Sequence, residues 1–209
     1  MVRLSRGEQI LCTVCRNHLP LTEYDFGQEN AVNRIFYGRT AIRKAAAMLY
    51  YDKEGVVKNL IHALKYKGQK QLGDFLGNWF GEILKNCISE ETFDYVIPVP
   101  LHSKKLRKRG YNQVEGFGKK LAFHLESEYR ADLLIKTANT RTQTTKSRLY
   151  RWMGSQALYK LQDAAELNHK NVLLVDDVIT TGSTLEACSE ALHKVPNIGV
   201  SVATMAVVS

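Results

Sequence analysis

The chain has 209 residues, of which 44% are hydrophobic and 24% are charged, and its formal net charge is +8. This length and composition are ordinary for a globular protein with one well-buried domain and a small appendage. No apolar stretch approaches the roughly 18 residues that a membrane-spanning helix needs, and the N-terminus lacks the apolar core of a signal peptide. We therefore expect no membrane span and a cytoplasmic location.

Cysteine count and charge narrow the setting further. Four cysteines do not make a disulfide framework in a chain of this length, which agrees with a reducing compartment. The excess of positive charge favours polyanionic partners. Nucleic acid and a small phosphorylated molecule both meet that condition, so charge alone does not separate them.

The first candidate site is a cysteine pair near the N-terminus. Cys12 and Cys15 have the spacing of one half of a zinc-binding knuckle, and His18 is a candidate third ligand. No fourth ligand is visible, because the other two cysteines lie alone in helical patterns typical of small core residues. We expect residues 1–30 to form a truncated or degenerate zinc-ribbon-like appendage whose zinc site is incomplete.

The next segment predicts a strand followed by two amphipathic helices. An apolar run over 45–51 is typical of a strand, and residues 55–65 and 69–86 carry apolar side chains at helical spacing. Lys65 and Lys67 precede a glycine, and cations in a last turn followed by glycine are a normal helix end. A ligand role for either lysine is the second-ranked alternative.

A further strand is predicted over 95–99. Pro98 and Pro100 end it, because proline has no N–H group for a central strand ladder. Residues 104–109 then place five cations in six positions before Gly110. We expect a loop that gathers phosphate charge, and a solvated charged surface is the equally weighted alternative.

Beyond this basic run, residues 114–125 resume helical spacing and residues 132–135 predict another strand. Residues 137–151 contain almost no apolar side chain and many hydroxyl groups and cations, so they cannot hold themselves in a core. This stretch is either a passive linker or a mobile lid that orders over an anionic ligand. The sequence leaves both open.

The most informative segment begins with a buried strand. Residues 172–175 form an apolar run typical of a central parallel strand, and Asp176 and Asp177 follow at its carboxyl end. A last strand is predicted over 199–208, and strands that alternate with helices at this spacing favour a parallel sheet. In open α/β sheets, ligands bind outside the carboxyl ends of the strands. The two aspartates are therefore candidate binding residues.

A hydroxyl-rich loop follows the aspartates. Residues 180–184 are Thr-Thr-Gly-Ser-Thr, and a helix is predicted over 185–195. The glycine lets a phosphate approach, and the free N–H groups of a helix N-terminus attract an anion. This order of parts suits a sugar phosphate. The alternative is an acidic turn that caps a helix through Ser183 or Thr184.

Residues 172–184 resemble the phosphoribosyl pyrophosphate (PRPP) motif of the type I phosphoribosyltransferases. The resemblance implies an α/β, type I phosphoribosyltransferase fold, with a central, mostly parallel sheet flanked by helices and with a helical hood region. It also implies that the catalytic pair, Asp176 and Asp177, holds the ribose hydroxyl groups and that the loop wraps the 5′-phosphate. The implied PRPP-binding residues are Val178, Thr180, Thr181, Gly182, Ser183 and Thr184.

Further segments resemble the ComF competence-protein family (ComF/GntX-like). They are residues 97–102, 107–113 and 140–144, Arg151, and the cysteine pair followed by Leu19-Pro20. Such proteins join an N-terminal zinc ribbon to a type I phosphoribosyltransferase domain and are associated with uptake and use of external DNA. The family ribbon normally carries two Cys-x-x-Cys pairs, whereas this chain carries one.

The ComF resemblance implies a domain division and more site residues. The appendage 1–30 is followed by a phosphoribosyltransferase-like domain over 31–209, with the hood at about 31–86 and the core at about 94–209. A pyrophosphate loop and lid would contain Val99, Pro100, Leu101, His102, Arg107, Arg141, Thr142 and Gln143. Mg²⁺ would bridge the pyrophosphate and ribose oxygens, and no nucleophilic side chain is required.

The implied function is Mg²⁺-dependent transfer of the phosphoribosyl group of PRPP to an unknown nucleobase-like acceptor, in a protein associated with DNA uptake. One alternative is a non-catalytic PRPP sensor that binds single-stranded DNA or a DNA-uptake helicase. Another is a zinc-ribbon interaction module with a vestigial enzyme domain. Tyr111 is the one aromatic residue evident near the basic run, which weakens a direct grip on a single strand. Kinase or NTPase activity is set aside, because the chain has no Gly-x-x-x-x-Gly-Lys-Ser/Thr loop.

Overall fold

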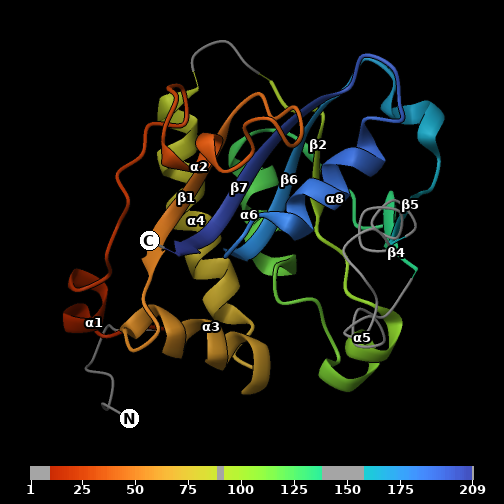
Figure 1. Ribbon diagram of the computed structural model, residues 1–209. Coiled ribbons are helices and arrows are strands. Elements are labelled where there is room, and N and C mark those ends of the chain that lie inside the picture. The colour runs from red at the N-terminus through yellow and green to blue at the C-terminus, as the bar shows by residue number, and fades with distance from the viewer. Residues whose placement is uncertain (1–9, 89–91, 138–157, 209) are drawn as a thin grey trace.

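A five-stranded parallel sheet forms the centre of the computed structural model, which describes residues 10–88, 92–137 and 158–208. The strand order is β1-β7-β6-β2-β3 (Figure 1), and each neighbouring pair is parallel. The strands are β1 (Ala45–Tyr51), β2 (Tyr95–Pro98), β3 (Glu128–Tyr129), β6 (Asn171–Ile179) and β7 (Gly199–Val208). The predicted fold class, a mostly parallel sheet flanked by helices, is confirmed.

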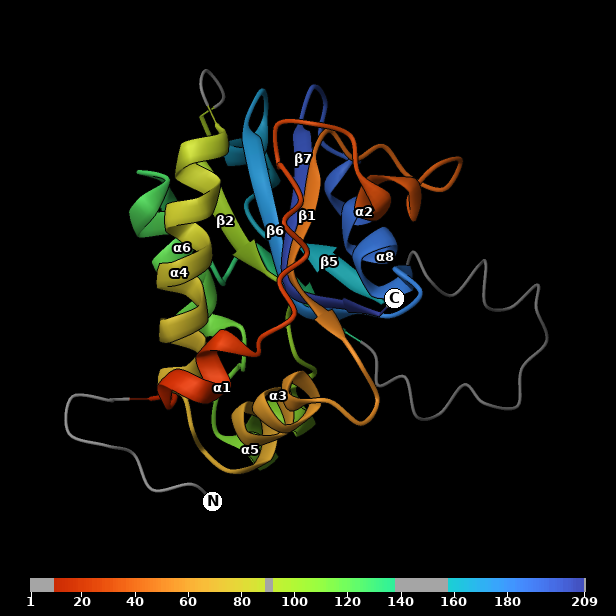
Figure 2. The same ribbon diagram turned by 90° about the vertical axis from the view of Figure 1, so that its left-hand side faces the viewer.

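Helices cover both faces of this sheet, as the view in Figure 2 shows. α4 (Gln71–Cys87) and α6 (Glu115–His124) pack on one face, and α2 (Ala31–Arg34) and α8 (Ser183–Leu192) pack on the other. α3 (Val56–Tyr66) follows the carboxyl end of β1, and α5 (Ser103–Arg109) follows that of β2. Both lie together beyond the end of the sheet where strands of this kind bind ligands.

Alternate residues of β6 face opposite helical layers. Leu173 and Val175 belong to the apolar cluster that contains α4 and α6, whereas Val172 and Leu174 belong to the cluster that contains α8. All four side chains are fully buried. A strand that is covered on both faces needs a continuous apolar run, which is why the sequence shows no alternation here.

Glycines allow α4 and α6 to pack closely. A Cβ atom at Gly77 would lie 2.7 Å from the carbonyl oxygen of Phe117, and one at Gly116 would lie 2.7 Å from Oδ1 of Asp74. The rings of Phe80 and Phe117 stack across the same contact, with their centroids 6.1 Å apart. This contact fixes the start of α6 relative to β6, where the candidate site lies.

One predicted strand pairs elsewhere. The strand expected over 132–135 is β4 (Leu134–Lys136), and it pairs antiparallel with β5 (Tyr159–Leu161) in a separate two-stranded sheet. The predicted strand is present, but it lies outside the parallel sheet. An apolar run shows that a strand forms but does not identify its partner. β3 and β5, which have two and three residues, were not predicted.

The basic segment 104–109 is helical, as part of α5, and the predicted loop is wrong. Lysine, arginine and leucine all have high helix propensity. At the start of α5 the His102 Nδ1 accepts a hydrogen bond from the Lys104 N–H at 3.2 Å, and at its end Gly110 has a left-handed φ of 81°. The cations therefore stand on a helical surface with defined ends.

Residues that follow the cysteine pair pack into the main core. Leu19 and Phe26 are buried in the cluster formed with α4 and α6. The N–H of Thr22 donates to the Met48 carbonyl at 3.0 Å, and the N–H of Tyr50 donates to the Pro20 carbonyl at 2.8 Å. The expected division at residue 30, and the boundaries of hood and core, stay predictions.

Two further expectations, the absence of a membrane span and the lid at 137–151, can be compared with the structure only over the described residues. Within the described ranges, no helix combines the length and apolarity required to cross a membrane. Apart from residue 137, the segment 137–151 lies outside the described residues, and with it the predicted lid residues Arg141, Thr142 and Gln143.

Candidate functional site

β6 continues through both predicted aspartates. Asp176 is in register with Thr204 of β7, and Ile179 is in register with Val207, so the strand ends at Ile179 and not before Asp176. Successive side chains of a strand point to opposite faces. Asp177 accordingly lies on the side of α3 and α6, and Asp176 lies on the side of α8. The two carboxyl groups have different surroundings.

Asp177 is a buried carboxylate held by side chains from two other segments. Its exposed fraction is 5%. Nζ of Lys65 donates to Oδ1 at 2.9 Å, and Nε2 of Gln113 donates to Oδ2 at 2.6 Å. A charge removed from water needs such partners, because an unpaired buried charge is strongly unfavourable. For Lys65, the sequence ranks a binding role second, after a role in ending α3. For Gln113, the sequence predicts no role.

Asp176 holds its proton more tightly than an exposed carboxyl group does. Burial first, and then the negative charge of Asp177, raise the pKa of Asp176 well above its ordinary value. The N–H of Asp177 donates to Oδ1 of Asp176 at 2.8 Å, and the charges of Lys65 and Lys136 act in the opposite direction without reversing the shift. A proton-retaining carboxyl thus stands next to a carboxylate paired with lysine.

A lysine and a tyrosine from β4 and β5 complete the surroundings of Asp176. Lys136 and Tyr159 are paired in register, and Nζ of Lys136 donates to the Tyr159 hydroxyl at 2.9 Å. Burial lowers the pKa of Lys136 and raises the pKa of the nearby Cys188 thiol. Sequence reasoning missed Lys136 and Tyr159, because the register between β4 and β5 is not visible in the residue pattern.

The loop at 180–184 turns at its glycine. Gly182 has a left-handed φ of 75° and forms the N-cap of α8. The Thr181 hydroxyl lies 3.0 Å from the Ser183 hydroxyl, and the N–H of Glu186 donates to the Gly182 carbonyl at 2.9 Å. A non-glycine residue is strained at this φ. The N–H of Ser183 donates to the Thr181 hydroxyl at 3.5 Å. The N–H groups of the next helical residues stay available to an anion.

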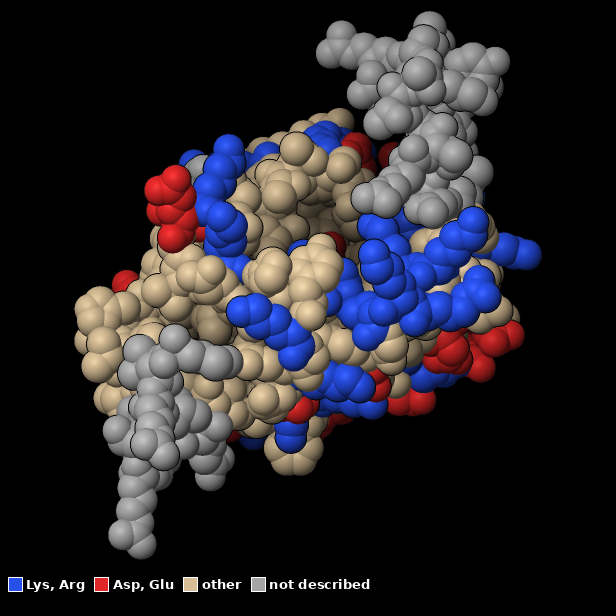
Figure 3. Space-filling view, turned by 90° about the horizontal axis from the view of Figure 1, so that it is seen from below, with Lys and Arg blue, Asp and Glu red and all other residues tan. Residues whose placement is uncertain are grey.

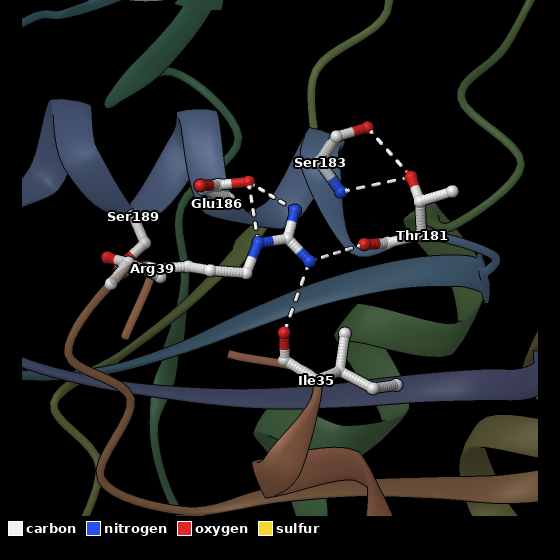
Figure 4. Close-up of polar contacts among 7 residues, drawn as sticks. Ile35, Arg39, Thr181, Ser183, Glu186 and Ser189 are labelled. Carbon is white, nitrogen blue, oxygen red and sulfur yellow. Dashed lines mark hydrogen bonds and ion pairs between the residues drawn. The ribbon is translucent and has the colours of Figure 1, made fainter. Parts of the chain in front are cut away.

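A small hollow brings most of the predicted PRPP-binding residues together with one aspartate. Its lining is Asp176, Val178, Ile179, Thr180, Gly182, Ser183, Thr184 and Leu185. Thr181 is the predicted member that does not line it. Its carbonyl is bonded to Arg39 instead (Figure 4).

The predicted pyrophosphate loop follows β2 directly. The N–H of Val99 donates to the Val175 carbonyl at 2.8 Å, and Nδ2 of Asn112 donates to the Val99 carbonyl at 3.0 Å, so Val99 itself is a buried anchor. Pro100 and Leu101 line a cavity of about 720 Å³ that also contains Lys136. His102 caps α5, and Arg107 is exposed on α5 but lines neither this cavity nor the basic cavity below.

A basic cavity of about 670 Å³ lies between the end of α3 and α5. It is lined by Lys65, Tyr66, Gly68, Lys104, Lys105, Lys108, Arg109 and Tyr111. Figure 3 shows Lys and Arg side chains gathered on this face beside a hollow. Tyr66 is 69% exposed, and the Arg109 guanidinium lies over its ring at 5.4 Å. Since Lys65 also binds Asp177, this cavity adjoins the aspartate site.

The cysteine pair does not fit a zinc site in the described part of the chain. Cys12 caps the short helix α1 (Thr13–Asn17), and its Sγ accepts a hydrogen bond from the Cys15 N–H at 3.3 Å. Nδ1 of His18 lies 2.7 Å from the Val14 carbonyl. A structural zinc ion needs four ligands, and the described residues contain no group of three or more His, Cys, Asp or Glu that could hold a metal.

Comparison with known proteins identifies the family to which the chain belongs. Residues 69–208 match the phosphoribosyl transferase domain. Competence protein F of Haemophilus influenzae is 35% identical over 100 residues, which are 47% of this chain and 44% of that protein. Competence protein ComFC of Streptococcus pneumoniae is 26% identical over 206 residues, which cover 93% of this chain and 86% of that protein.

Other similarities are more distant or shorter. The DNA utilization protein YhgH of Escherichia coli O157:H7 is 27% identical over 136 residues, covering 64% of this chain and 59% of that protein. The chain thus spans about half the length of the first two relatives, at 44% and 59%. Among solved structures, adenine phosphoribosyltransferase from Saccharomyces cerevisiae is 20% identical with a TM-score of 0.41, covering 67% of this chain and 69% of that chain. A structural likeness of this size has no weight for function.

Proposed function

Because the chain belongs to the phosphoribosyl transferase domain family, and within it to the ComF competence proteins, we propose that it binds PRPP with Mg²⁺ and transfers the phosphoribosyl group to a nucleobase-like acceptor. The observation that carries the proposal is the end of β6. There Asp177, held by Lys65 and Gln113, stands on a strand that leads directly into the glycine-turned loop before α8.

The loop at 180–184 would bind the 5′-phosphate. Its backbone N–H groups and hydroxyl groups are hydrogen-bond donors, and the start of α8 adds the positive end of a helix dipole. A bound phosphate needs hydrogen-bond donors on several sides. It also needs a backbone position without a bulky side chain where the loop comes closest to it. Gly182 meets the second requirement, and Thr180, Ser183 and Thr184 contribute to the first.

Asp177 would hold the ribose. A carboxylate can accept about four hydrogen bonds, so the bonds from Lys65 and Gln113 leave it able to accept one from a ribose hydroxyl. These two partners fix its orientation before the sugar arrives. When the bond to pyrophosphate breaks, positive charge develops at C1′, and a fixed negative group nearby stabilises that charge.

Pyrophosphate would leave toward the loop after β2 and the cations of α5. Mg²⁺ binds one or two carboxylates together with substrate phosphates, so Asp177, and Asp176 after it has lost its proton, are the oxygen donors here that would suit it. The ion, when bound, would neutralise charge that develops on the leaving pyrophosphate. Lys65 and the α5 lysines that line the basic cavity supply further positive charge from the protein itself.

Titration calorimetry with PRPP and Mg²⁺ tests this proposal. We expect saturable binding by the wild type and at least a tenfold weaker affinity after the double change Asp176→Asn and Asp177→Asn, since charge-assisted hydrogen bonds are worth about 1.5–3 kcal/mol each. Glu128→Gln, an exposed carboxyl change on β3, is the matched control and should bind as the wild type does. Equal binding by the double variant would reject the assigned site.

Turnover needs a second measurement. Pyrophosphate release from PRPP is followed across a panel of nucleobases and with water alone. Release that depends on one base supports transfer to that acceptor. Binding of PRPP without release for any base or for water would reject transfer and leave the sensor function.

A second candidate function, binding of a single-stranded nucleic acid, is favoured by the basic cavity. Base stacking needs an exposed aromatic face, and phosphate contacts need cations beside it. The sequence showed only Tyr111 near the basic run, but Tyr111 is 8% exposed while Tyr66, from α3, is 69% exposed. With Lys104, Lys105 and Lys108 in the same cavity, Tyr66 supplies the missing stacking face.

A further inference from the structure

Arg39 binds the phosphate loop from a distant part of the sequence. It lies in the connection between α2 and β1, and its Nη1 donates to the Thr181 carbonyl at 2.6 Å and to the Ile35 carbonyl at 3.1 Å. Its Nε donates to Oε2 of Glu186 at 3.1 Å, and Nη2 bonds the same oxygen. Figure 4 shows one guanidinium group joined to three residues, two of which belong to the loop and the first turn of α8.

We propose that Arg39 is a positioning residue that orients the loop at 180–184 for the 5′-phosphate, an inference that rests on the proposed function. The argument starts from the peptide between Thr181 and Gly182. A trans peptide is planar, and its C=O and N–H groups point in opposite directions. Because Arg39 holds the Thr181 carbonyl, the N–H of Gly182 points away from Arg39. That N–H is then free to donate into the hollow that Gly182 lines and Arg39 does not.

Arg39 also offsets the negative charge of Glu186 at the start of α8. Glu186 lies in the first turn, where its negative charge would repel a phosphate dianion at the helix N-terminus. The ion pair with Arg39 offsets this charge. Without Arg39, the loop would lose an anchor for its peptide, and the bound anion would face an uncompensated carboxylate.

The backbone around Gly182 fits closely against the same segment. A Cβ atom at Gly182 would lie 2.7 Å from Cγ2 of Ile35 and 3.3 Å from Cε1 of Phe36. Residues 35–39 thus support the loop by packing as well as by hydrogen bonds. The peptide turned by Arg39 has little room to rotate back.

The residues next to Arg39 offer a matched control. The Thr40 hydroxyl donates to Oγ of Ser189 at 3.0 Å, and Nε2 of His193 lies 2.7 Å from the Ala41 carbonyl. These contacts attach the same segment to the last part of α8 and to its C-cap residue, away from the loop. Thr40→Ala therefore weakens the attachment of the segment without touching Thr181 or Glu186.

The experiment compares two ligands that each contain part of PRPP. Dissociation constants for ribose 5-phosphate and for inorganic pyrophosphate with Mg²⁺ are measured by calorimetry for the wild type, Arg39→Met, Arg39→Lys and Thr40→Ala. For Arg39→Met we expect about tenfold weaker binding of ribose 5-phosphate, because that change corresponds to the loss of one charge-assisted hydrogen bond to the phosphate. Binding of pyrophosphate should be unchanged. For Arg39→Lys we expect an intermediate loss, because one ammonium group cannot reproduce the planar fork of arginine. Thr40→Ala should lower the melting temperature and leave both dissociation constants unchanged.

The outcomes separate this inference from the function on which it rests. If the wild type binds neither PRPP nor ribose 5-phosphate, the proposed function and this inference both fail. If the wild type binds and Arg39→Met binds ribose 5-phosphate equally well, or loses both ligands to the same extent, only the positioning role is overturned. Should Arg39→Met fail to fold, Arg39→Lys decides: unchanged binding of ribose 5-phosphate by Arg39→Lys counts against the role, and a selective loss supports it.

Discussion

Asp176 and Asp177 show how two identical neighbouring residues acquire different properties. Asp177 faces α3 and α6 and is paired with Lys65 and Gln113. Asp176 faces α8, where burial and the charge of Asp177 raise its pKa. The alternation of side chains along β6 is the cause, because it sends one carboxyl group to each face of the sheet.

The raised pKa of Asp176 predicts that this residue lowers the stability of the free protein above acid pH. Well below pH 4, Asp176 is protonated in both states and has no effect. As the pH rises, the carboxyl ionises in the unfolded chain, whereas the folded chain keeps its proton until the raised pKa is passed, so stability falls over that interval. We expect Asp176→Asn to increase the free energy of unfolding at pH 8 by about 1–3 kcal/mol, with a gain that becomes much smaller as the pH falls toward 4.

Urea unfolding from pH 4 to pH 8 measures this difference. Glu54→Gln, an exposed carboxyl change in the segment before α3, serves as the control and should show no comparable pH-dependent gain. A gain for Asp176→Asn that is the same at every pH would contradict the electrostatic explanation.

At the scale of elements, the contact of α4 with α6 decides where the partners of Asp177 stand. Gln113 lies two residues before α6, so the position of that helix sets the position of the Gln113 amide. Leu64 and Lys65 lie near the end of α3, and the Tyr111 hydroxyl bonds the Leu64 carbonyl, which connects α3 to the segment before α6. The surroundings of Asp177 are therefore built on α3, α4 and α6, whose buried residues share one apolar cluster.

Gly77→Ala should weaken this contact. The added Cβ atom would lie 2.7 Å from the Phe117 carbonyl oxygen, and the backbone of α6 would have to move. We expect a loss of about 1–3 kcal/mol in the free energy of unfolding, although alanine is the better helix former in isolation. Thermal and urea unfolding measure it, with Lys85→Ala at an exposed position of α4 as the control. A stability equal to or above that of the wild type would show that α4 and α6 can separate at no cost.

At the scale of the whole molecule, the cations are distributed so that one face is strongly basic. α5 and the end of α3 come together beyond the end of the sheet, and the cavity between them collects cations from both (Figure 3). The net charge of +8 alone does not produce such a face. Its position next to Asp177 would let a polyanion lie across the entrance of the proposed PRPP site.

Salt dependence distinguishes a nucleic-acid surface from general attraction. For a fluorescent single-stranded oligonucleotide, the double change Lys104→Gln and Lys108→Gln should reduce the slope of log affinity against log salt by about 1.4, since each lost phosphate contact on a single strand contributes about 0.7. Tyr66→Ala should lower the affinity by about 1–3 kcal/mol and leave the slope unchanged, because stacking releases no counterions.

The control for this measurement removes two cations elsewhere. Lys85→Gln with Lys194→Gln makes the same change in net charge at exposed positions that do not line the basic cavity. An equal loss of slope in this control would mean that the basic face has no special role.

The sequence by itself determined three features: the parallel sheet, the main strands and helices in their order along the chain, and the loop at 180–184. These features follow from local signals. The apolar run at 172–175 marks a strand buried on both faces, and the glycine of Thr-Thr-Gly-Ser-Thr marks a turn before a helix. Only the tertiary structure decided which residues surround the two aspartates and that loop. Lys65 and Gln113 reach Asp177 from other elements, and Arg39 reaches the loop. Lys136 comes close to Asp176 because β4, which carries it, pairs with β5. Such contacts depend on how helices and strands pack together. Contacts between polar side chains of different elements produce no periodic pattern in the sequence.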